Sequence, residues 1–343
     1  MTKILIVDDS AFMRQIFKKI IENEPGLTLV GTARHGQQAL QMIPKLKPDV
    51  ITLDIEMPVK NGLETLEEIM RLEKPIPTIM CSSLDDRETV LKALELGAFD
   101  FIPKPSKSLT LKISEIAHDL TIKIKAAAIL DKKPSTVKPV TLLKKKIHKA
   151  KSPDQYPIIA IGTSSGGPKA LKAIIPAFPA DLPAAILIVQ HMPPGFTASL
   201  AKRLDQNSAI KVKEATEDDQ LQPGLALIAP GGYHLEVTDN NHILLNQKPT
   251  KWGVRPCVDY MLISASQVFT HRMIGVILTG MGQDGAEGMK VIKANNGYGI
   301  IEDKSTAQVY GMPGATIRAN AYDQIVPLNQ IPEKIIDVIE RRF

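Results

Sequence analysis

The chain has few cysteines and no long apolar run. Cys81 and Cys257 are the only cysteines among 343 residues. This scarcity argues against a disulfide framework or a thiolate metal site and suits a reducing cytoplasm. No apolar run approaches the roughly 18 residues that a membrane-spanning helix needs. A signal peptide is not expected, because the apolar residues ILIV near the start are followed at once by Asp8 and Asp9. These absences predict a cytoplasmic protein without membrane insertion.

The positive charge of the chain is concentrated in one segment. The net charge is +5, but residues 121–155 hold ten lysines against two aspartates, so this segment carries +8 and the rest of the chain −3. A DNA-binding domain needs a basic stripe on a folded surface, and this distribution therefore predicts no nucleic-acid partner. The segment contains three prolines and little apolar area, which predicts a linker between two domains, with a start compatible with a helix.

Residues 1–120 alternate between short apolar runs and amphipathic stretches. Five runs have the length and flanking residues of strands: KILIVD, LTLVGTA, PDVITLD, PTIMCSS and DFIPKP. After Ser10, which fits an N-cap, helical spacing predicts one apolar face that consists of Phe12, Met13, Ile16, Phe17, Ile20 and Ile21. The alternation predicts a five-stranded parallel sheet that helices cover on both faces.

Residues 156–343 form a second series of the same kind. The strand candidates are IIAIG, AAILIVQ, GLALIAP, MIGVILTG and YGIIED. The stretch HLEVTDNNHILLN resembles a β-hairpin, with Asp239, Asn240 and Asn241 at its turn. The series predicts a three-layer α/β domain with a mostly parallel sheet and one hairpin.

Polar side chains follow the predicted strands of the first half. Asp8, Asp9, Asp54, Ser82 and Lys104 each stand where a strand ends, and functional groups gather at the carboxyl ends of parallel strands. Clustered carboxylates without histidine or cysteine suit Mg²⁺, which prefers oxygen ligands and a phosphate. One aspartate can then act as the nucleophile toward a phosphoryl group, whose oxygens the metal, the lysine and the hydroxyl stabilise.

The motifs ILIVDDS, DVITLDIEMPVKNG, IMCSS and DFIPKP make residues 1–120 similar to the receiver domain of bacterial response regulators. The resemblance implies a flavodoxin-like fold and phosphorylation of Asp54 by a histidine kinase. It also implies Mg²⁺ ligation by Asp8, Asp9, Asp54 and the backbone carbonyl of Glu56. The residues that would sense the phosphoryl group are Ser82, Lys104 and the aromatic Phe101. Pro105 would follow a cis Lys-Pro bond.

Three polar residues mark strand ends in the second half. Ser164 lies in the pattern Gly162-Thr163-Ser164-Ser165-Gly166, a strand-to-helix turn that alone fits a nucleophile, an anion site or a plain turn. His191 follows a buried strand candidate, and Asp284 lies in a glycine-rich loop after another. Together they can supply a nucleophile, a base and an orienting acid. Their order along the chain differs from that of the α/β-hydrolases, so we expect a different scaffold.

The motifs IGTSSGGP, QHMPPGF, RPCVD and LTGMGQDGAEGM resemble the catalytic domain of the chemotaxis protein-glutamate methylesterases across residues 156–343. The resemblance implies Ser164 as nucleophile, His191 as general base and then acid, and Asp284 as the residue that orients the imidazole. Backbone N–H groups near Ser165 and Met281 would form the oxyanion hole. The family usually has threonine at position 165 and serine at position 257, where this chain has Ser165 and Cys257, and the second difference puts a hydroxyl hydrogen bond in doubt.

The same resemblance implies an activity and partners. The enzyme would hydrolyse glutamate γ-methyl esters on chemoreceptors, release methanol and deamidate receptor glutamines. A chemotaxis histidine kinase would be the phosphodonor, and methylated chemoreceptors would be the substrate, at receptor arrays in the cytoplasm. We expect a monomer with Mg²⁺ in the receiver domain and no cofactor in the catalytic domain. We also expect the unphosphorylated receiver to restrict access to Ser164.

Two other interpretations stay open at this point. The protein could be a phosphorylation-regulated esterase or amidase with another substrate. It could also be a non-catalytic regulator that binds a nucleotide phosphate at residues 162–167, although the segment lacks G-K-[ST] and a clean G-x-G-x-x-G.

Overall fold

The computed structural model describes residues 1–83, 86–104, 113–129 and 156–343. Contacts divide the chain into two units, residues 1–134 and 135–343, and each is described by itself. Pro105, with its predicted cis bond, and residues 130–155 of the predicted linker lie outside the described residues. Within the described part of the chain, no helix is long and apolar enough to cross a bilayer.

The first unit is a five-stranded parallel sheet with the strand order β2-β1-β3-β4-β5. Its strands are β1 (Thr2–Val7), β2 (Leu27–Ala33), β3 (Val50–Asp54), β4 (Thr78–Ser82) and β5 (Asp100–Pro103). Its helices are α1 (Ala11–Asn23), α2 (Gly36–Leu46), α3 (Gly62–Met70), α4 (Arg87–Leu96) and α5 (Ile113–Ala128). The predicted flavodoxin-like order is confirmed, and its switch point lies between β1 and β3.

Two details of this unit differ from the sequence-based expectation. Ser10 caps α1 as predicted, since its side chain accepts a hydrogen bond from the Met13 N–H. Only part of the predicted apolar face is buried, because Phe12 is 68% exposed and lies with Ile16 and Ile20 along a groove beside α5. Residues 121–128 of the predicted linker belong to α5, where Ile124, Ala126 and Ala127 are buried and Ile122 is exposed.

The second unit has a seven-stranded sheet with the order β14-β13-β12-β6-β7-β9-β8, in which every neighbouring pair is parallel. Its strands are β6 (Ile158–Thr163), β7 (Ala185–Gln190), β8 (Lys211–Glu214), β9 (Leu225–Ile228), β12 (Met273–Ile277), β13 (Tyr298–Glu302) and β14 (Gln324–Val326). The predicted hairpin is confirmed as β10 (His234–Val237) and β11 (Ile243–Asn246), which pair antiparallel. The edge strands β8 and β14 are absent from the sequence-based prediction.

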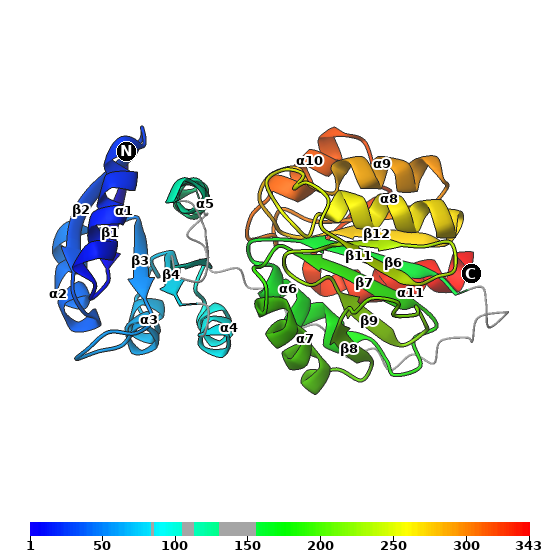
Figure 1. Ribbon diagram of the computed structural model, residues 1–343, viewed down its shortest axis with the longest axis horizontal. Coiled ribbons are helices and arrows are strands. Elements are labelled where there is room, and N and C mark those ends of the chain that lie inside the picture. The colour runs from blue at the N-terminus through cyan, green and yellow to red at the C-terminus, as the bar shows by residue number, and fades with distance from the viewer. Residues whose placement is uncertain (84–85, 105–112, 130–155) are drawn as a thin grey trace. The chain divides into compact units, whose positions relative to one another are not determined.

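Helices cover both faces of this sheet, as predicted, with α8, α9 and α10 on one face and α6, α7 and α11 on the other (Figure 1). Their bounds are α6 (Gly167–Ile174), α7 (Phe196–Asn207), α8 (Val258–Phe269), α9 (Ala286–Ala294), α10 (Gly311–Arg318) and α11 (Ile331–Arg342). Three short 3-10 helices span Ile175–Ala177, Thr270–Arg272 and Leu328–Gln330.

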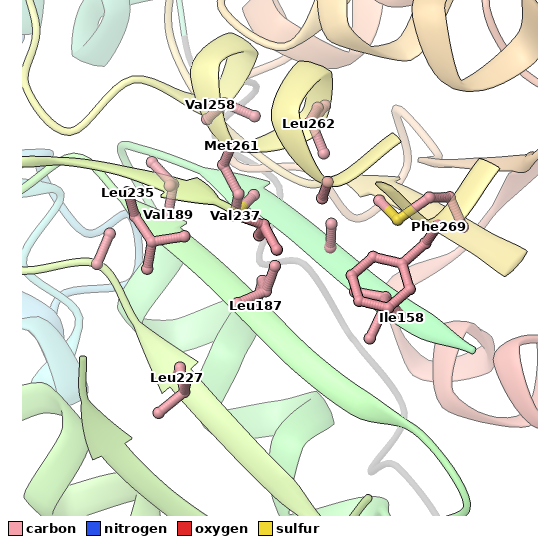
Figure 2. Close-up of a cluster of buried hydrophobic side chains, with 14 of the residues drawn as sticks. Ile158, Leu187, Val189, Leu227, Leu235, Val237, Val258, Met261, Leu262 and Phe269 are labelled. Carbon is pink, nitrogen blue, oxygen red and sulfur yellow. The ribbon is translucent and has the colours of Figure 1, made fainter. Parts of the chain in front are cut away.

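The core beneath α8 fixes where this helix begins. Figure 2 shows buried side chains of β6, β7, β9 and β10 against the apolar face of α8, among them Ile158, Leu187, Val189, Leu227, Leu235, Val237, Met261, Leu262 and Phe269. A Cβ atom at Gly162, near the end of β6, would lie 2.3 Å from the side chain of Val258, the first residue of α8. The N-terminus of α8 therefore lies at the carboxyl edge of the sheet.

Candidate active site and acidic pocket

Three carboxylates meet at the carboxyl edge of the first sheet. Asp8 follows β1, Asp9 comes next, and Asp54 ends β3, the strand beside β1. One carboxylate oxygen from each lies within 4.8 Å of the others. Asp8 and Asp54 are buried, whereas Asp9 is exposed to solvent. This oxygen-only set fits a hard divalent cation that keeps several waters.

Lys104 sits against two of these acids. Its Nζ atom lies 2.6 Å from Asp54 Oδ2 and 3.0 Å from Asp8 Oδ2. Burial raises the pKa of Asp54 to about 6, although the hydrogen bond from Lys104 opposes the rise. The buried Asp54 is therefore held beside the positive charge of Lys104, in a pocket where burial disfavours the ionised form of its carboxyl group.

The other predicted receiver residues lie along the same edge and on β5. Ser82 ends β4, and its buried hydroxyl has no hydrogen-bond partner among the described residues. Phe101 in β5 is 4% exposed, and the Nζ atom of Lys123 lies 5.5 Å from its ring centre. Glu56 is exposed and lines a shallow pocket of about 510 Å³ with Asp9.

Ser164 is the first residue after β6 and begins a tight turn. Its carbonyl oxygen accepts a hydrogen bond from Gly167 N at 2.8 Å, and its own N–H donates to Thr279 O at 3.1 Å. Gly166 has φ 82°, a left-handed conformation that favours glycine. The turn leads directly into α6, so Ser164 lies beside a helix N-terminus at the sheet edge.

His191 and Asp284 form a hydrogen-bonded pair next to this turn. Because β6 and β7 are parallel with Thr163 opposite Gln190, Ser164 and His191 are the next residues on neighbouring strands. His191 Nε2 lies 2.8 Å from Asp284 Oδ2. The side chain of His191 is 11% exposed and that of Asp284 is 2% exposed. The three residues predicted from strand ends are thus brought to one edge of one sheet.

Asp284 is surrounded by hydrogen-bond donors. Besides His191, the N–H groups of Val258 and Asp259 at the start of α8 donate to it at 2.7 and 2.9 Å. Burial by itself raises the pKa of Asp284, but the bonds from His191, Val258 and Cys257 outweigh it and the pKa lies below its usual value. The helix N-terminus also favours a negative charge here. Asp284 is therefore ionised at neutral pH.

Cys257 is one of the donors to Asp284. Its Sγ atom lies 3.1 Å from Asp284 Oδ1, and the residue is fully buried. Burial and then the nearby negative charge of Asp284 raise the pKa of the thiol, so it stays protonated and donates its proton. The hydrogen bond in doubt at this position is thus made by a thiol. A protonated, buried thiol is a poor nucleophile.

The backbone that follows β12 comes close to Ser164. A Cβ atom at Gly280 would lie 2.9 Å from Ser164 Cβ, so no larger residue fits there without a shift. Met281 follows Gly280 directly, and Ser165 follows Ser164 at the N-terminal side of α6. Both predicted oxyanion-hole residues are therefore neighbours of Ser164.

Sequence reasoning missed several residues that hold the site together. Asp259 is fully buried and accepts hydrogen bonds from the Gly285 and Gly288 N–H groups and from Trp252 Nε1, at 2.8 to 3.0 Å. Gln190 Nε2 donates to the carbonyl oxygens of Ser164 and His191 at 3.0 and 3.1 Å. Gln190 ends an otherwise apolar strand, and this was the available signal for it. Asp259 ends the motif RPCVD, but the sequence carried no signal for its hydrogen bonds, because its partners come from distant segments.

The seven-stranded sheet places these groups at its topological switch point. From β6 the chain continues to β7 on one side and later returns to β12 on the other. Ligands of open α/β sheets bind at such a point, outside the carboxyl ends of the strands. A serine, a histidine and an ionised acid there, beside close backbone turns, suit acyl transfer through a serine.

Comparisons with known proteins agree with this geometry. A family model described as CheB methylesterase matches residues 159–335, and one described as response regulator receiver domain matches residues 4–114. A protein-glutamate methylesterase/protein-glutamine glutaminase of Pyrococcus horikoshii is 48% identical, with 98% of this chain and 94% of the relative covered. A relative with the same name from Clostridium acetobutylicum is 42% identical, with 98% and 97% covered.

A solved structure resembles the second unit. The catalytic domain of the Thermotoga maritima CheB methylesterase is 44% identical, with a TM-score of 0.53, and the match covers 54% of this chain and 99% of that one. Together with the near full-length relatives, this likeness shows that the chain belongs to the CheB family of protein-glutamate methylesterases/protein-glutamine glutaminases with a response-regulator receiver domain.

Proposed function

We propose that this protein is a phosphorylation-activated serine hydrolase that demethylates glutamate γ-methyl esters on chemoreceptors. It releases methanol, also deamidates receptor glutamines, and so contributes to sensory adaptation in chemotaxis. The observation that carries the proposal is the 2.8 Å hydrogen bond between His191 and Asp284 on the strand end beside Ser164. The names of the near full-length relatives supply the substrate class.

In the first half of the reaction, Ser164 Oγ attacks the ester carbonyl and His191 takes the hydroxyl proton. Because Nε2 of His191 is engaged by Asp284, Nδ1 is the ring nitrogen that serves Ser164. The bond between the carbonyl carbon and the methoxy oxygen breaks, and His191 gives the proton to the departing methoxide, which leaves as methanol. Asp284 stays ionised and stabilises the imidazolium.

In the second half, water attacks the glutamyl ester of Ser164. His191 accepts a proton from the water and returns it to Ser164 Oγ, which leaves the restored serine and a glutamic acid side chain that loses its proton to solvent. The backbone N–H groups of Ser165 and Met281 stabilise the oxyanion that forms in both halves. A glutamine substrate follows the same route with ammonia as the leaving group.

The receiver site consists of the residues around Asp54, the proposed acceptor of a phosphoryl group from a histidine kinase. Receiver domains generally bind Mg²⁺ at an acidic pocket, and the ligands here would be Asp8, Asp9, Asp54 and the carbonyl of Glu56. When bound, Mg²⁺ neutralises charge on the phosphoryl oxygens. Lys104 and Ser82 would contact those oxygens, and Phe101 is the proposed switch residue. The proposal is supported by the contact of Lys104 with Asp54 and by the Ser82 hydroxyl, which has no hydrogen-bond partner among the described residues.

The two activities are proposed to lie in separate domains, predicted as residues 1–120 and 156–343. Because α5 extends to Ala128, the first domain is longer than predicted and the proposed linker is shorter than 121–155. Phosphorylation of Asp54 would raise the activity of the catalytic domain. We place the protein in the cytoplasm at chemoreceptor arrays, as a monomer that binds its kinase and its methylated receptor.

The first prediction concerns the nucleophile. The wild-type protein should release methanol from a methylated receptor, and Ser164→Ala should abolish release because alanine has no hydroxyl to attack the ester carbonyl. Ser199→Ala, on α7, removes a serine outside the site and should keep the wild-type rate. Methanol release is measured with receptor that carries labelled methyl groups. Activity in Ser164→Ala would overturn the catalytic assignment, and failure of the wild type on the receptor would overturn the substrate class.

A further inference from the structure

A buried acid that the reaction does not use lies behind the catalytic turn. Glu302 is the last residue of β13, and its side chain is fully buried. No lysine, arginine or histidine in the described part of the chain forms an ion pair with it. Among the described residues its Oε1 atom also has no hydrogen-bond partner. Burying a carboxyl group without a cation partner costs free energy, so its retention needs a reason.

Glu302 contacts one residue of the site directly. Its Oε2 atom accepts a hydrogen bond from the Thr279 N–H at 2.7 Å. Because β12 and β13 are parallel with Ile277 opposite Ile301, Thr279 and Glu302 lie at the same carboxyl edge of the sheet. The acid therefore holds the peptide that begins the loop from β12 to Asp284.

Thr279 in turn holds the nucleophile turn. Its carbonyl oxygen accepts hydrogen bonds from Ser164 N at 3.1 Å and from Thr163 Oγ1 at 2.9 Å. Its hydroxyl donates to the Ser165 carbonyl oxygen at 2.8 Å. Thr279 also precedes Gly280 and Met281, where one of the two oxyanion donors is proposed. A shift of Thr279 would therefore move both the nucleophile and that donor.

We propose that Glu302 is a positioning residue for the methylesterase reaction, which acts on Ser164 and the oxyanion hole through the Thr279 N–H. This inference rests on the proposed function of Ser164. Glu302 touches neither substrate nor reacting atoms, and its effect is on the geometry of the groups that do.

The ionisation of Glu302 gives this role a pH dependence. Burial raises the pKa of Glu302 to about 7, and hydrogen bonds from the Thr279 N–H and from the Thr306 side chain oppose that rise. Among the described residues, the negative charge of Asp303 raises it further, and Tyr310 is a titratable neighbour whose own pKa the charge of Glu302 helps to raise. A carboxylate accepts a hydrogen bond more strongly than a protonated carboxyl group. The contact with Thr279 therefore weakens as the pH falls through neutrality.

Protonation of Glu302 should therefore slow the reaction of Ser164. Glu302→Gln keeps the shape and an acceptor oxygen but does not titrate, so it should fix the weaker contact at every pH. The variant should react roughly tenfold more slowly than the wild type at about pH 8, where Glu302 is ionised. At about pH 5.5, where Glu302 is protonated, it should react at nearly the wild-type rate.

The test measures covalent labelling of Ser164 by a serine-directed phosphonate in the full chain. An Asp54→Asn background removes the ionisation of the receiver acid from the profile. Glu333→Gln, which replaces an exposed acid at the start of α11, is the matched control and should keep the wild-type rate at both pH values. Thermal unfolding is recorded in parallel, because the loss of a residue that only stabilises the fold would lower the unfolding temperature without producing a rate difference that depends on pH.

Each outcome decides a different point. A Glu302→Gln rate equal to the wild-type rate at about pH 8 overturns the positioning role. A tenfold difference that persists at about pH 5.5 also overturns it. If Glu302→Gln fails to fold, Asp303→Asn takes its place: it removes the charge that raises the pKa of Glu302, so it should react faster than wild type near pH 6.5, and equal rates there overturn the role. Labelling that does not depend on Ser164, seen as equal labelling of Ser164→Ala, overturns the proposed function instead. A roughly tenfold difference between wild type and Glu302→Gln at about pH 8 that disappears at about pH 5.5 supports the proposal.

Discussion

At the scale of single residues, the hydrogen-bond donors around Asp284 keep its carboxylate ionised beside His191. Four donors surround its two oxygens, and one of them is the thiol of Cys257 rather than a hydroxyl. Hydrogen bonds to a charged group are stronger than neutral ones, but a thiol is a weak donor. The contribution of Cys257 should therefore be measurable yet smaller than that of the two backbone N–H groups.

Replacement of Cys257 tests this contribution. Cys257→Ala removes a donor from Asp284 and should lower kcat roughly three- to tenfold, with little change in KM. Cys257→Ser supplies a hydroxyl and should keep at least the wild-type rate. Cys81→Ala, in the first unit, is the matched control for loss of a buried cysteine and is measured without phosphodonor. Equal rates for Cys257→Ala and Cys257→Ser would show that the donor does not matter.

The raised pKa of Asp54 predicts that the stability of the first unit depends on pH. Its pKa is raised from 3.8 to about 6 by burial. The folded state therefore binds a proton more tightly than the unfolded state, and stability falls as the pH rises between these two values. Above about pH 6 the full cost is present, on the order of 3 kcal/mol. Asp54→Asn should remove this dependence, so that its advantage over wild type is larger at about pH 8 than at about pH 4.

The two cysteines allow the measurement to be made in the whole protein. Cys81 lies buried in the first unit and Cys257 in the second. Labelling of each thiol during a urea titration, followed by mass spectrometry, reports the unfolding of each unit separately. The dependence on pH should appear at Cys81, and a wild-type curve parallel to that of Asp54→Asn at all pH values would refute it.

At the scale of elements, the N-terminus of α8 and the loop before α9 form one unit around two acids. Asp284 accepts from the first N–H groups of α8, and Asp259 on α8 accepts from the N–H groups of Gly285 and Gly288. Each segment thus satisfies the orphan N–H groups of the other. Asp259 has two further partners, since Trp252 Nε1 and Lys251 Nζ both contact its Oδ2 atom.

Asp259→Asn should loosen this arrangement. The amide cannot accept at both of its polar atoms, so a buried donor loses its partner, at a cost on the order of 1–3 kcal/mol. Trp252 is the one tryptophan of the chain, so its emission reports the loss directly and should shift to longer wavelength. Glu287→Gln removes only the exposed partner of Lys251 and should change neither emission nor stability by much. Unchanged emission in Asp259→Asn would contradict the structural role.

The elements that the sequence predicted share a strong local signal. The central strands are continuous apolar runs that end in polar residues, and Ser10 marks the start of α1. The edge strands β8 and β14 were missed because an edge strand is short and half exposed, so KVKE and QIV lack that apolar signal. The same limit applies to the site. Ser164, His191 and Asp284 stand at strand ends, whereas Asp259, Thr279 and Glu302 act through contacts that only the folded sheet creates.

At the scale of the whole molecule, one chain carries the proposed phosphoryl-accepting site and the proposed ester-hydrolysing site in separate units. Asp54 lies in a pocket built by β1, β3, β4 and Lys104, and Ser164 lies at the switch point of a different sheet. Each unit has its own core, so each site can form without the other. A link between them requires only that phosphorylation change the free energy of access to Ser164 by a few kcal/mol, roughly what shifts a two-state equilibrium.

The rate of methanol release from methylated receptor, with and without a small-molecule phosphodonor, tests this link most directly. The wild-type protein should release methanol faster when the phosphodonor and Mg²⁺ are present. Asp54→Asn should keep its basal rate and show no acceleration, because its amide cannot accept the phosphoryl group. Equal rates for wild type and Asp54→Asn under both conditions would contradict the coupling of Asp54 to Ser164.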